Sequence, residues 1–272
     1  MTEPSRKRLS RVARRSVLGA CLVLAALVAL PGALVAQPFE AADARCRKAL
    51  HSGAQRLGRM LLKEQNRCHQ ARMRGKLPLV TDCNDPASFL SPVRIARAEA
   101  AALRTAARCA KAAPPASLGY AACPAPCGAV PVGTYDGVAE CLVCLTRSEV
   151  PAAIAAVFGL PAFGETDRLD RLCQAYVGRV MGFYLSARMR QQAHCQYLHD
   201  REKVDPGLDC VTADLRGVIA TQLFNARQVI AACSLDDIVS AQMCGADVPS
   251  LQACFAAAAN AASDDLFAAA YP

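Results

Sequence analysis

Residues 46–68 read CRKALHSGAQRLGRMLLKEQNRC, a basic segment bounded by two cysteines that stand 22 positions apart. A third cysteine, Cys83, follows 15 positions later. The same spacing recurs 127 positions further along the chain, at Cys173, Cys195 and Cys210. A fourth cysteine follows each trio, Cys109 in the first copy and Cys233 in the second. A fixed offset of this kind indicates an internal repeat, so we expect two copies of one structural unit.

The quoted segment has the periodicity of a long amphipathic helix. Leu50, Leu57 and Leu61 fall on one stripe with the two flanking cysteines at 3.6 residues per turn. Helices are expected over residues 44–75, 91–111, 170–199 and 213–233, with further helices beginning near Asp136, Ser148 and Pro249. No stretch alternates in the manner of a strand. The sequence therefore predicts an all-α fold of two tandem disulfide-stapled helical-hairpin repeats, each with an additional C-terminal helical segment.

The N-terminus has the pattern of a signal peptide. Six basic residues lie between Arg6 and Arg15, and an almost wholly apolar stretch follows from Val17 to Ala36. Cleavage is expected after Ala36, with cleavage after Ala33 and an uncleaved membrane anchor as the alternatives. We therefore expect an exported protein, periplasmic or extracellular, that meets a membrane only through an uncleaved anchor. Without residues 1–36 the chain has 25 basic and 22 acidic residues, so its excess of positive charge is small.

Beyond this segment, the sequence predicts two domains of ordinary size. They are a first helical repeat with eight cysteines at residues 37–163 and a second with six at residues 164–272. Hydrophobic residues make up 53% of the chain, but aromatic residues only 5%, and tryptophan is absent. Alanine-rich helices of this kind bury little area each, so covalent cross-links are expected to support the core.

Fourteen cysteines remain after the signal peptide, an even number that predicts seven disulfides in an oxidising compartment. Twenty-two helical residues span about 33 Å, which excludes a bond between Cys46 and Cys68. In an antiparallel hairpin the start of the first helix lies beside the end of the second, and each loop cysteine lies near the preceding helix end. The expected pairs are Cys46–Cys109, Cys68–Cys83, Cys173–Cys233, Cys195–Cys210 and Cys244–Cys254, with Cys127–Cys141 nested inside Cys123–Cys144.

The cysteines at 123, 127, 141 and 144 allow two other interpretations. Their spacing would suit a four-cysteine zinc site in a cytosolic protein. Cys141 and Cys144 also form a C-x-x-C motif, which could serve a thiol–disulfide oxidoreductase. The export signal favours structural disulfides over both alternatives. We therefore expect no metal and no cofactor.

The first long helix is strongly basic. Residues 45–111 contain 15 basic and 4 acidic side chains, whereas the chain from residue 112 contains 10 basic and 16 acidic ones. Six cations cluster on the flank opposite the apolar stripe: Lys48, Arg56, Arg59, Lys63, Arg67 and Arg74. This flank is either a solvated helix face, partly offset by the acidic second copy, or a site for an anionic envelope surface such as lipopolysaccharide, an acidic polysaccharide or an acidic partner. Nucleic acid is not expected, because few aromatic residues interleave with the arginines.

No catalytic set stands out in the sequence. We find no combination of serine, histidine and aspartate and no pair of carboxylates that would suggest an enzyme. The chain also lacks a glycine-rich phosphate loop. His69 and His194 stand beside cysteines and are interpreted as helix-surface residues. The leading functional hypothesis is accordingly a non-catalytic exported binding or envelope-structural module with a basic helix face.

Three features of the sequence are shared with a known group of proteins. They are a basic helix that begins with a cysteine, a cysteine at the end of the second helix, and the segment Cys141-Leu142-Val143-Cys144. The layout resembles a group of exported, cysteine-rich, alanine-rich helical proteins of environmental Gram-negative bacteria. The resemblance covers most of residues 44–160 and, more weakly, 170–272. It implies an exported helical protein and no particular activity. The second copy departs from the pattern, because Phe255-Ala256-Ala257 follows Cys254 and the second cysteine is missing.

Overall fold

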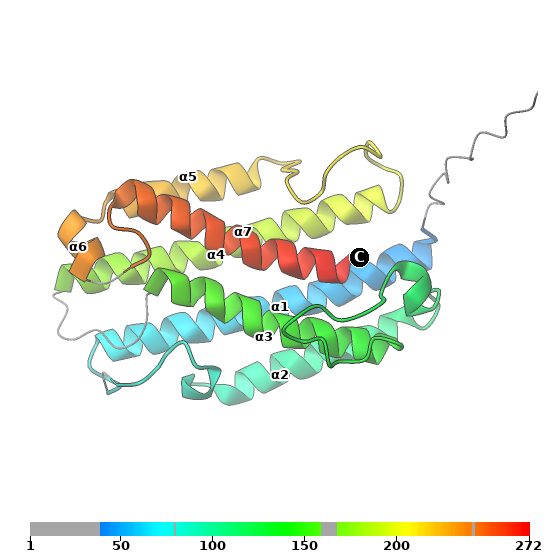
Figure 1. Ribbon diagram of the computed structural model, residues 1–272, viewed down its shortest axis with the longest axis horizontal. Helices are drawn as coiled ribbons and strands as arrows, with labels where there is room; N and C mark the ends of the chain where they lie inside the picture. Colours follow the sequence, from blue (N-terminus) through cyan, green and yellow to red (C-terminus); the bar gives the residue numbers. More distant parts are fainter. Residues whose placement is uncertain (1–38, 79, 159–167, 241–242) are drawn as a thin grey trace, which may run out of the picture. The chain divides into compact units, whose positions relative to one another are not determined.

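The computed structural model describes residues 39–78, 80–158, 168–240 and 243–272, and within these ranges every regular element is helical (Figure 1). The all-α prediction is confirmed for this part of the chain. The expected signal peptide at residues 1–36 and the expected boundary at residues 163 and 164 lie outside it. Residues 38–272 form one compact unit, so the two expected copies share a single packed body.

Seven α-helices make up the described part of the chain: α1 (Ala41–Met73), α2 (Pro92–Leu103), α3 (Tyr135–Phe158), α4 (Arg168–His199), α5 (Val218–Ala231), α6 (Leu235–Ser240) and α7 (Val248–Ala270). Short 3₁₀ turns add η1 (Pro86–Ser88), η2 (Arg104–Cys109) and η3 (Pro115–Leu118). The expected break at Ser148 is wrong, because α3 continues through Pro151 to Phe158. The expected helix from residue 213 begins later, at Val218, after Gly217 adopts a φ of 65°.

Local chemistry explains where these helices begin and end. At the end of α1 the backbone N–H of Gly75 donates to Arg72 and that of Lys76 to Ala71. Gly75 has a φ of 68°, the left-handed conformation that glycine adopts without a Cβ clash. At the start of α7 the side chain of Asp247 accepts from the backbone N–H of Ser250, and Ser250 reciprocates in a capping box.

The two longest helices, α1 and α4, pack against each other in opposite directions. Arg47 near the start of α1 contacts Asp200 just after α4, and Asn66 near the end of α1 contacts Gly178 near the start of α4. Helices α3 and α7 lie side by side and cover one side of this pair, while α2 flanks α1 and α5 flanks α4 (Figure 1). One side of the α1–α4 pair is therefore left for solvent.

Seven disulfides brace this arrangement. Five join the expected partners: Cys46–Cys109, Cys68–Cys83, Cys173–Cys233, Cys195–Cys210 and Cys244–Cys254. In the four-cysteine segment the predicted nesting is wrong, since the bonds are Cys123–Cys141 and Cys127–Cys144. The prediction assumed that the segment before α3 runs back along the helix as a hairpin. Instead it coils, with the N–H of Cys127 bonded to the carbonyl of Pro124, and its cysteines meet α3 in the same order.

Helix α3 is the one described helix that is long and apolar enough to cross a membrane by length and composition, with a mean hydropathy of 1.6. It packs against both α1 and α7. Val150, Ile154 and Val157 are fully buried there. A core helix of a folded bundle has the same composition, so its hydropathy is explained by its place in the core.

Candidate functional site

The solvent side of α1 is uniformly cationic. From Arg45 to the end of the helix, the exposed side chains are Arg45, Lys48, Arg56, Arg59 and Lys63. At 3.6 residues per turn these five positions fall within an arc of about 80°. The rest of the helix surface is buried or partly buried because α2, α3, α4 and α7 pack around it. Helix α1 thus presents one narrow cationic strip to solvent.

Helix α4 presents a second strip. From Leu172 to His199 its exposed side chains are Leu172, Tyr176, Arg179, Phe183 and Arg190, and this stretch contains no aspartate or glutamate at all. These positions fall within an arc of about 60°. The acidic residues of the second half therefore do not offset the basic flank here. Most of the acidic residues from Asp200 onward lie in the loop after α4 and on α6 and α7, as at Asp209, Asp236 and Asp264.

The two strips meet in a hollow of about 900 Å³ between α1, α4 and α5, which we call the basic groove. Its cations are Arg59, Lys63 and Arg67 from α1 and Arg179 and Arg190 from α4. Leu62, Gly182 and Phe183 contribute apolar surface to the lining, and Asn66, Gln70, Ser186, Gln222 and Asn225 contribute uncharged polar groups. Among the described residues no carboxylate lines the groove. Fixed positive charges above a low-dielectric floor concentrate anions at such a site.

A second hollow of about 480 Å³ continues along the start of α1. It is lined by Arg45, Lys48, Arg56 and Arg108, together with Tyr197 from the end of α4. The ammonium nitrogen of Lys48 lies 3.9 Å from the centroid of the Tyr197 ring, a cation–π contact. The two hollows extend the same cationic strip over most of the length of α1.

A third hollow, of about 320 Å³, differs because it contains an acid. Arg67, Arg74, Lys76 and Arg94 line it beside the buried carboxylate of Glu64. Arg67 donates to Glu64 at 2.7 Å and Arg94 at 3.4 Å. Part of this local positive charge is therefore already neutralised, and Arg67 is committed to Glu64 even where it borders the basic groove.

The six expected anion-binding residues are consequently divided among three hollows. Arg59, Lys63 and Arg67 line the basic groove, Lys48 and Arg56 line the second hollow, and Arg74 lines the third. Sequence reasoning missed Arg179, Phe183 and Arg190, which supply the opposite wall. Their spacing of 4 and 7 positions places them on one helix face, but only the pairing of α1 with α4 brings that face beside the arginines. This pairing also places Phe183 and Tyr197 beside basic residues, so aromatic side chains do lie among the cations of this face.

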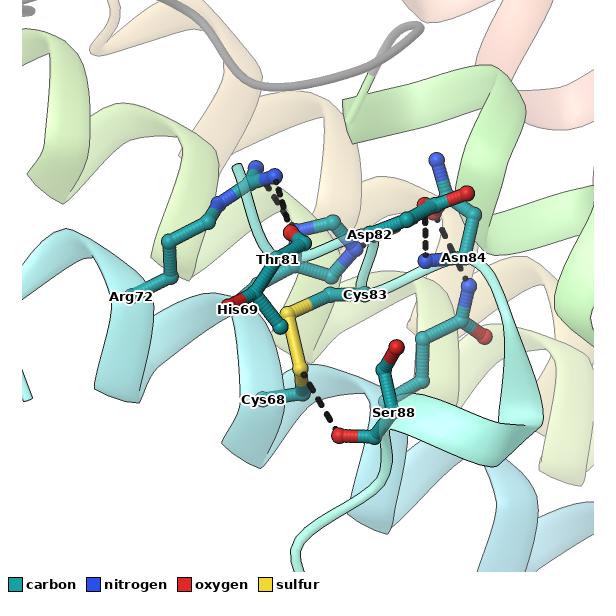
Figure 2. Close-up of a disulfide and its surroundings, with 9 residues drawn as sticks. Cys68, His69, Arg72, Thr81, Asp82, Cys83, Asn84 and Ser88 are labelled. Carbon is teal, nitrogen blue, oxygen red and sulfur yellow. Dashed lines mark hydrogen bonds between the residues drawn. A yellow bond between two sulfur atoms is a disulfide. The ribbon is translucent and has the colours of Figure 1, made fainter. Parts of the chain in front are cut away.

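The interpretation of His69 as a surface residue is wrong. Its ring is buried and stacks on Phe158 with 3.9 Å between ring centroids. Nε2 lies 3.1 Å from Oδ1 of Asn84, and Nδ1 lies 3.3 Å from a guanidinium nitrogen of Arg72, which also donates to the carbonyl of Thr81 (Figure 2). Burial, with the nearby Arg72 charge, lowers the pKa of His69 to about 3. The ring is therefore neutral and holds the Cys68–Cys83 loop, a structural role.

His51 is also buried, under the C-terminal end of α7. Its ring meets Tyr271 edge-on at 5.3 Å, and neither of its ring nitrogens has a hydrogen-bond partner among the described residues. Burial lowers the pKa of His51 to about 4. His194, by contrast, is partly buried and contacts Arg216.

The four-cysteine segment forms two disulfides that each join the loop to α3. Cys141 and Cys144 are bonded to Cys123 and Cys127 rather than to each other. A C-x-x-C redox centre cycles through a bond between its own two sulfurs, and zinc requires free thiolates. Within the described ranges, no group of three or more histidine, cysteine or acidic side chains is arranged to hold a metal ion.

The comparisons with known proteins give no relative from which a function could be transferred. No family model, no curated protein and no solved structure matches this chain. The chemistry of the α1–α4 face therefore rests on its own residues.

Proposed function

We propose that the protein is an exported, non-catalytic binding module whose α1–α4 face holds an anionic ligand of the cell envelope or its surroundings. One observation carries the proposal: from Arg45 onward every exposed side chain of α1 is a cation, and the exposed strip of α4 beside it has no acid. Seven disulfides indicate an oxidising compartment, which agrees with the expected export signal at residues 1–36.

The charge of this face is concentrated where a ligand could use it. The chain beyond residue 36 has a small net charge, yet Arg59, Lys63, Arg179 and Arg190 gather around one hollow. Among the described residues none of these four takes part in an ion pair. Exposed cations near an anionic surface contribute about 1 kcal/mol each, an attraction that salt screens within about 10 Å at 0.1 M.

The disulfide pattern supports binding over the two alternatives. A thiol–disulfide oxidoreductase using Cys141 and Cys144 would need these cysteines to bond with each other. A four-cysteine zinc module would need the same cysteines as thiolates. Their bonds to Cys123 and Cys127 favour neither.

We also propose that residues 37–163 and 164–272 are two copies of one unit, as in the exported helical proteins that the sequence resembles. Two matching contacts support this, because Phe158 and Tyr271 are in equivalent places, 17 positions after Cys141 and Cys254 respectively. The Phe158 ring at the end of α3 occupies the space beside Gly178, and the Tyr271 ring at the end of the second half lies 5.3 Å from His51. Positions 51 and 178 differ by 127, the offset of the cysteine frame. By the same offset Lys63 corresponds to Arg190, so each copy would contribute a cation to the basic groove.

Binding of lipopolysaccharide and of polygalacturonate, at low and at high salt, tests the function. The double variant Arg59→Gln/Lys63→Gln should weaken binding at least tenfold at low salt. Its matched control is Arg97→Gln/Arg104→Gln, which removes two exposed cations on the α2 side that line none of the three hollows. An equal loss of binding affinity in the two double variants would show that binding depends on net charge rather than on this face. Failure of every anionic probe to bind at low salt would overturn the proposal.

A further inference from the structure

We propose that the basic groove takes a single-chain anionic amphiphile: a phosphate or carboxylate headgroup held by the cations of α1 and α4, with its acyl chain on the apolar floor. This inference rests on the proposed function and specifies its ligand class. A simple polyanion would pair with the cations alone, whereas an amphiphile would pair with the cations and also cover the apolar part of the lining.

The headgroup contacts come from cations on both walls. Arg59 and Lys63 lie on the exposed strip of α1, and Arg179 and Arg190 lie on that of α4. No ion pair among the described residues engages them. Arginine also presents several N–H donors that match phosphate and carboxylate oxygens. A headgroup placed between the walls would meet cations from α1 and from α4 together.

The chain contacts come from the floor of the groove. Leu62 is 3% exposed and forms part of the lining, and the ring of Phe183 is open to solvent, with 52% of the residue exposed. The position next to Phe183 is Gly182, where a Cβ would find its nearest neighbour 3.9 Å away, so this part of the wall is open. Phe183 lies between Arg179 and Arg190 on the exposed strip of α4, so an acyl chain that covers its ring would lie beside both cations.

The size of the basic groove agrees with this ligand class. A hollow of about 900 Å³ lies within the range of about 300–1,000 Å³ typical of small-molecule sites, which are mostly apolar with a few polar groups that orient the ligand. A polymer bearing only carboxylates would leave the exposed ring of Phe183 in contact with water. A neutral lipid would cover the four exposed cations without supplying a counter-charge. An anionic headgroup on an acyl chain avoids both costs.

The test compares three probes below their micellar concentrations, using the purified full-length protein. Dodecyl phosphate has the charge and the chain, glycerol phosphate has the charge without the chain, and dodecylphosphocholine has the chain without net charge. We expect dodecyl phosphate to bind at least tenfold more tightly than either of the others. Phe183→Ala should weaken dodecyl phosphate binding at least fivefold.

The matched control is Phe224→Ala, which removes another exposed phenylalanine, on α5, that does not line the groove. It should leave dodecyl phosphate binding unchanged. Far-UV circular dichroism verifies that both variants are folded. If glycerol phosphate binds as tightly as dodecyl phosphate, or if the two phenylalanine variants behave alike, the amphiphile inference is wrong while an anion-binding function stands. If no anionic probe binds, the proposed function itself fails.

Discussion

Arg47 and Asp200, 153 positions apart in the sequence, form a buried ion pair with 3.0 Å between Nη1 and Oδ1. The pair ties the start of α1 to the end of α4. Gln196 also donates to this carboxylate, and the guanidinium of Arg47 lies 4.3 Å from the centroid of the Phe39 ring. Burial raises the pKa of Asp200, while Arg47 and Gln196 act in the opposite direction. The pair thus joins α1 and α4, the two helices that line the basic groove, through a contact in the core.

Removing one partner of this pair should be costly. Asp200→Ala leaves the Arg47 guanidinium buried without its counter-charge, a change that typically destabilises a protein by about 3–5 kcal/mol. Urea unfolding at neutral pH measures the loss. Glu140→Ala, which removes an exposed carboxylate of α3 that forms no ion pair among the described residues, is the control and should cost much less. The double variant Arg47→Met/Asp200→Leu should recover part of the stability, because no uncompensated charge remains.

The buried histidines predict acid sensitivity. His69 and His51 have pKa values lowered to about 3 and about 4 by burial, against 6.5 for an exposed histidine. Between these values and 6.5 the unfolded chain binds protons that the folded chain does not, so stability falls as the pH is lowered through this window. His69→Gln should reduce the difference in urea midpoint between pH 7 and pH 4.5. An unchanged difference would show that His69 does not contribute to the acid response.

The disulfide pairing in the four-cysteine segment predicts how many free thiols two double variants will have. Cys123→Ser/Cys141→Ser removes one whole disulfide, so it should show no more free thiols than the wild type. Cys127→Ser/Cys141→Ser breaks two bonds and should show two additional thiols when titrated in denaturant. The first variant should lose about 3 kcal/mol of stability, the contribution typical of closing a loop of this length. Under the nested pairing the two thiol counts would be exchanged.

Sequence spacing was sufficient for the contacts that depend on helix geometry alone. Cys46 and Cys109 could be paired because a hairpin brings two helix ends together. The spacing alone does not determine which of Cys123 and Cys127 bonds with Cys141, because this depends on how a non-helical segment coils. His69 was assigned to the surface because its partner, Phe158, lies 89 positions away on α3. Only one wall of the basic groove could be predicted, for the same reason. Arg59 and Lys63 stand out in the sequence, but Arg190 joins them only through the packing of α4 on α1.

Two glycines on α4 provide a test of how closely α3 of the first half packs against α4 of the second half. A Cβ at Gly178 would lie 2.3 Å from the Phe158 ring and 2.6 Å from the side-chain oxygen of Asn66, so something must shift. Overpacking of this kind typically costs about 1–3 kcal/mol. At Gly182, one turn later, the nearest atom would be 3.9 Å away. Gly182→Ala should therefore be neutral or stabilising by up to about 1 kcal/mol, since alanine favours the helix.

The comparison of Gly178→Ala with Gly182→Ala in urea unfolding isolates the contact from helix propensity, because the same substitution is made in the same helix. Phe158→Leu should lessen the cost of Gly178→Ala, since the smaller side chain vacates the space that the new methyl group needs. Equal stability of the two alanine variants would contradict the close approach of α3 to α4. A loss confined to Gly178→Ala would establish that the end of the first half is packed directly against the long helix of the second.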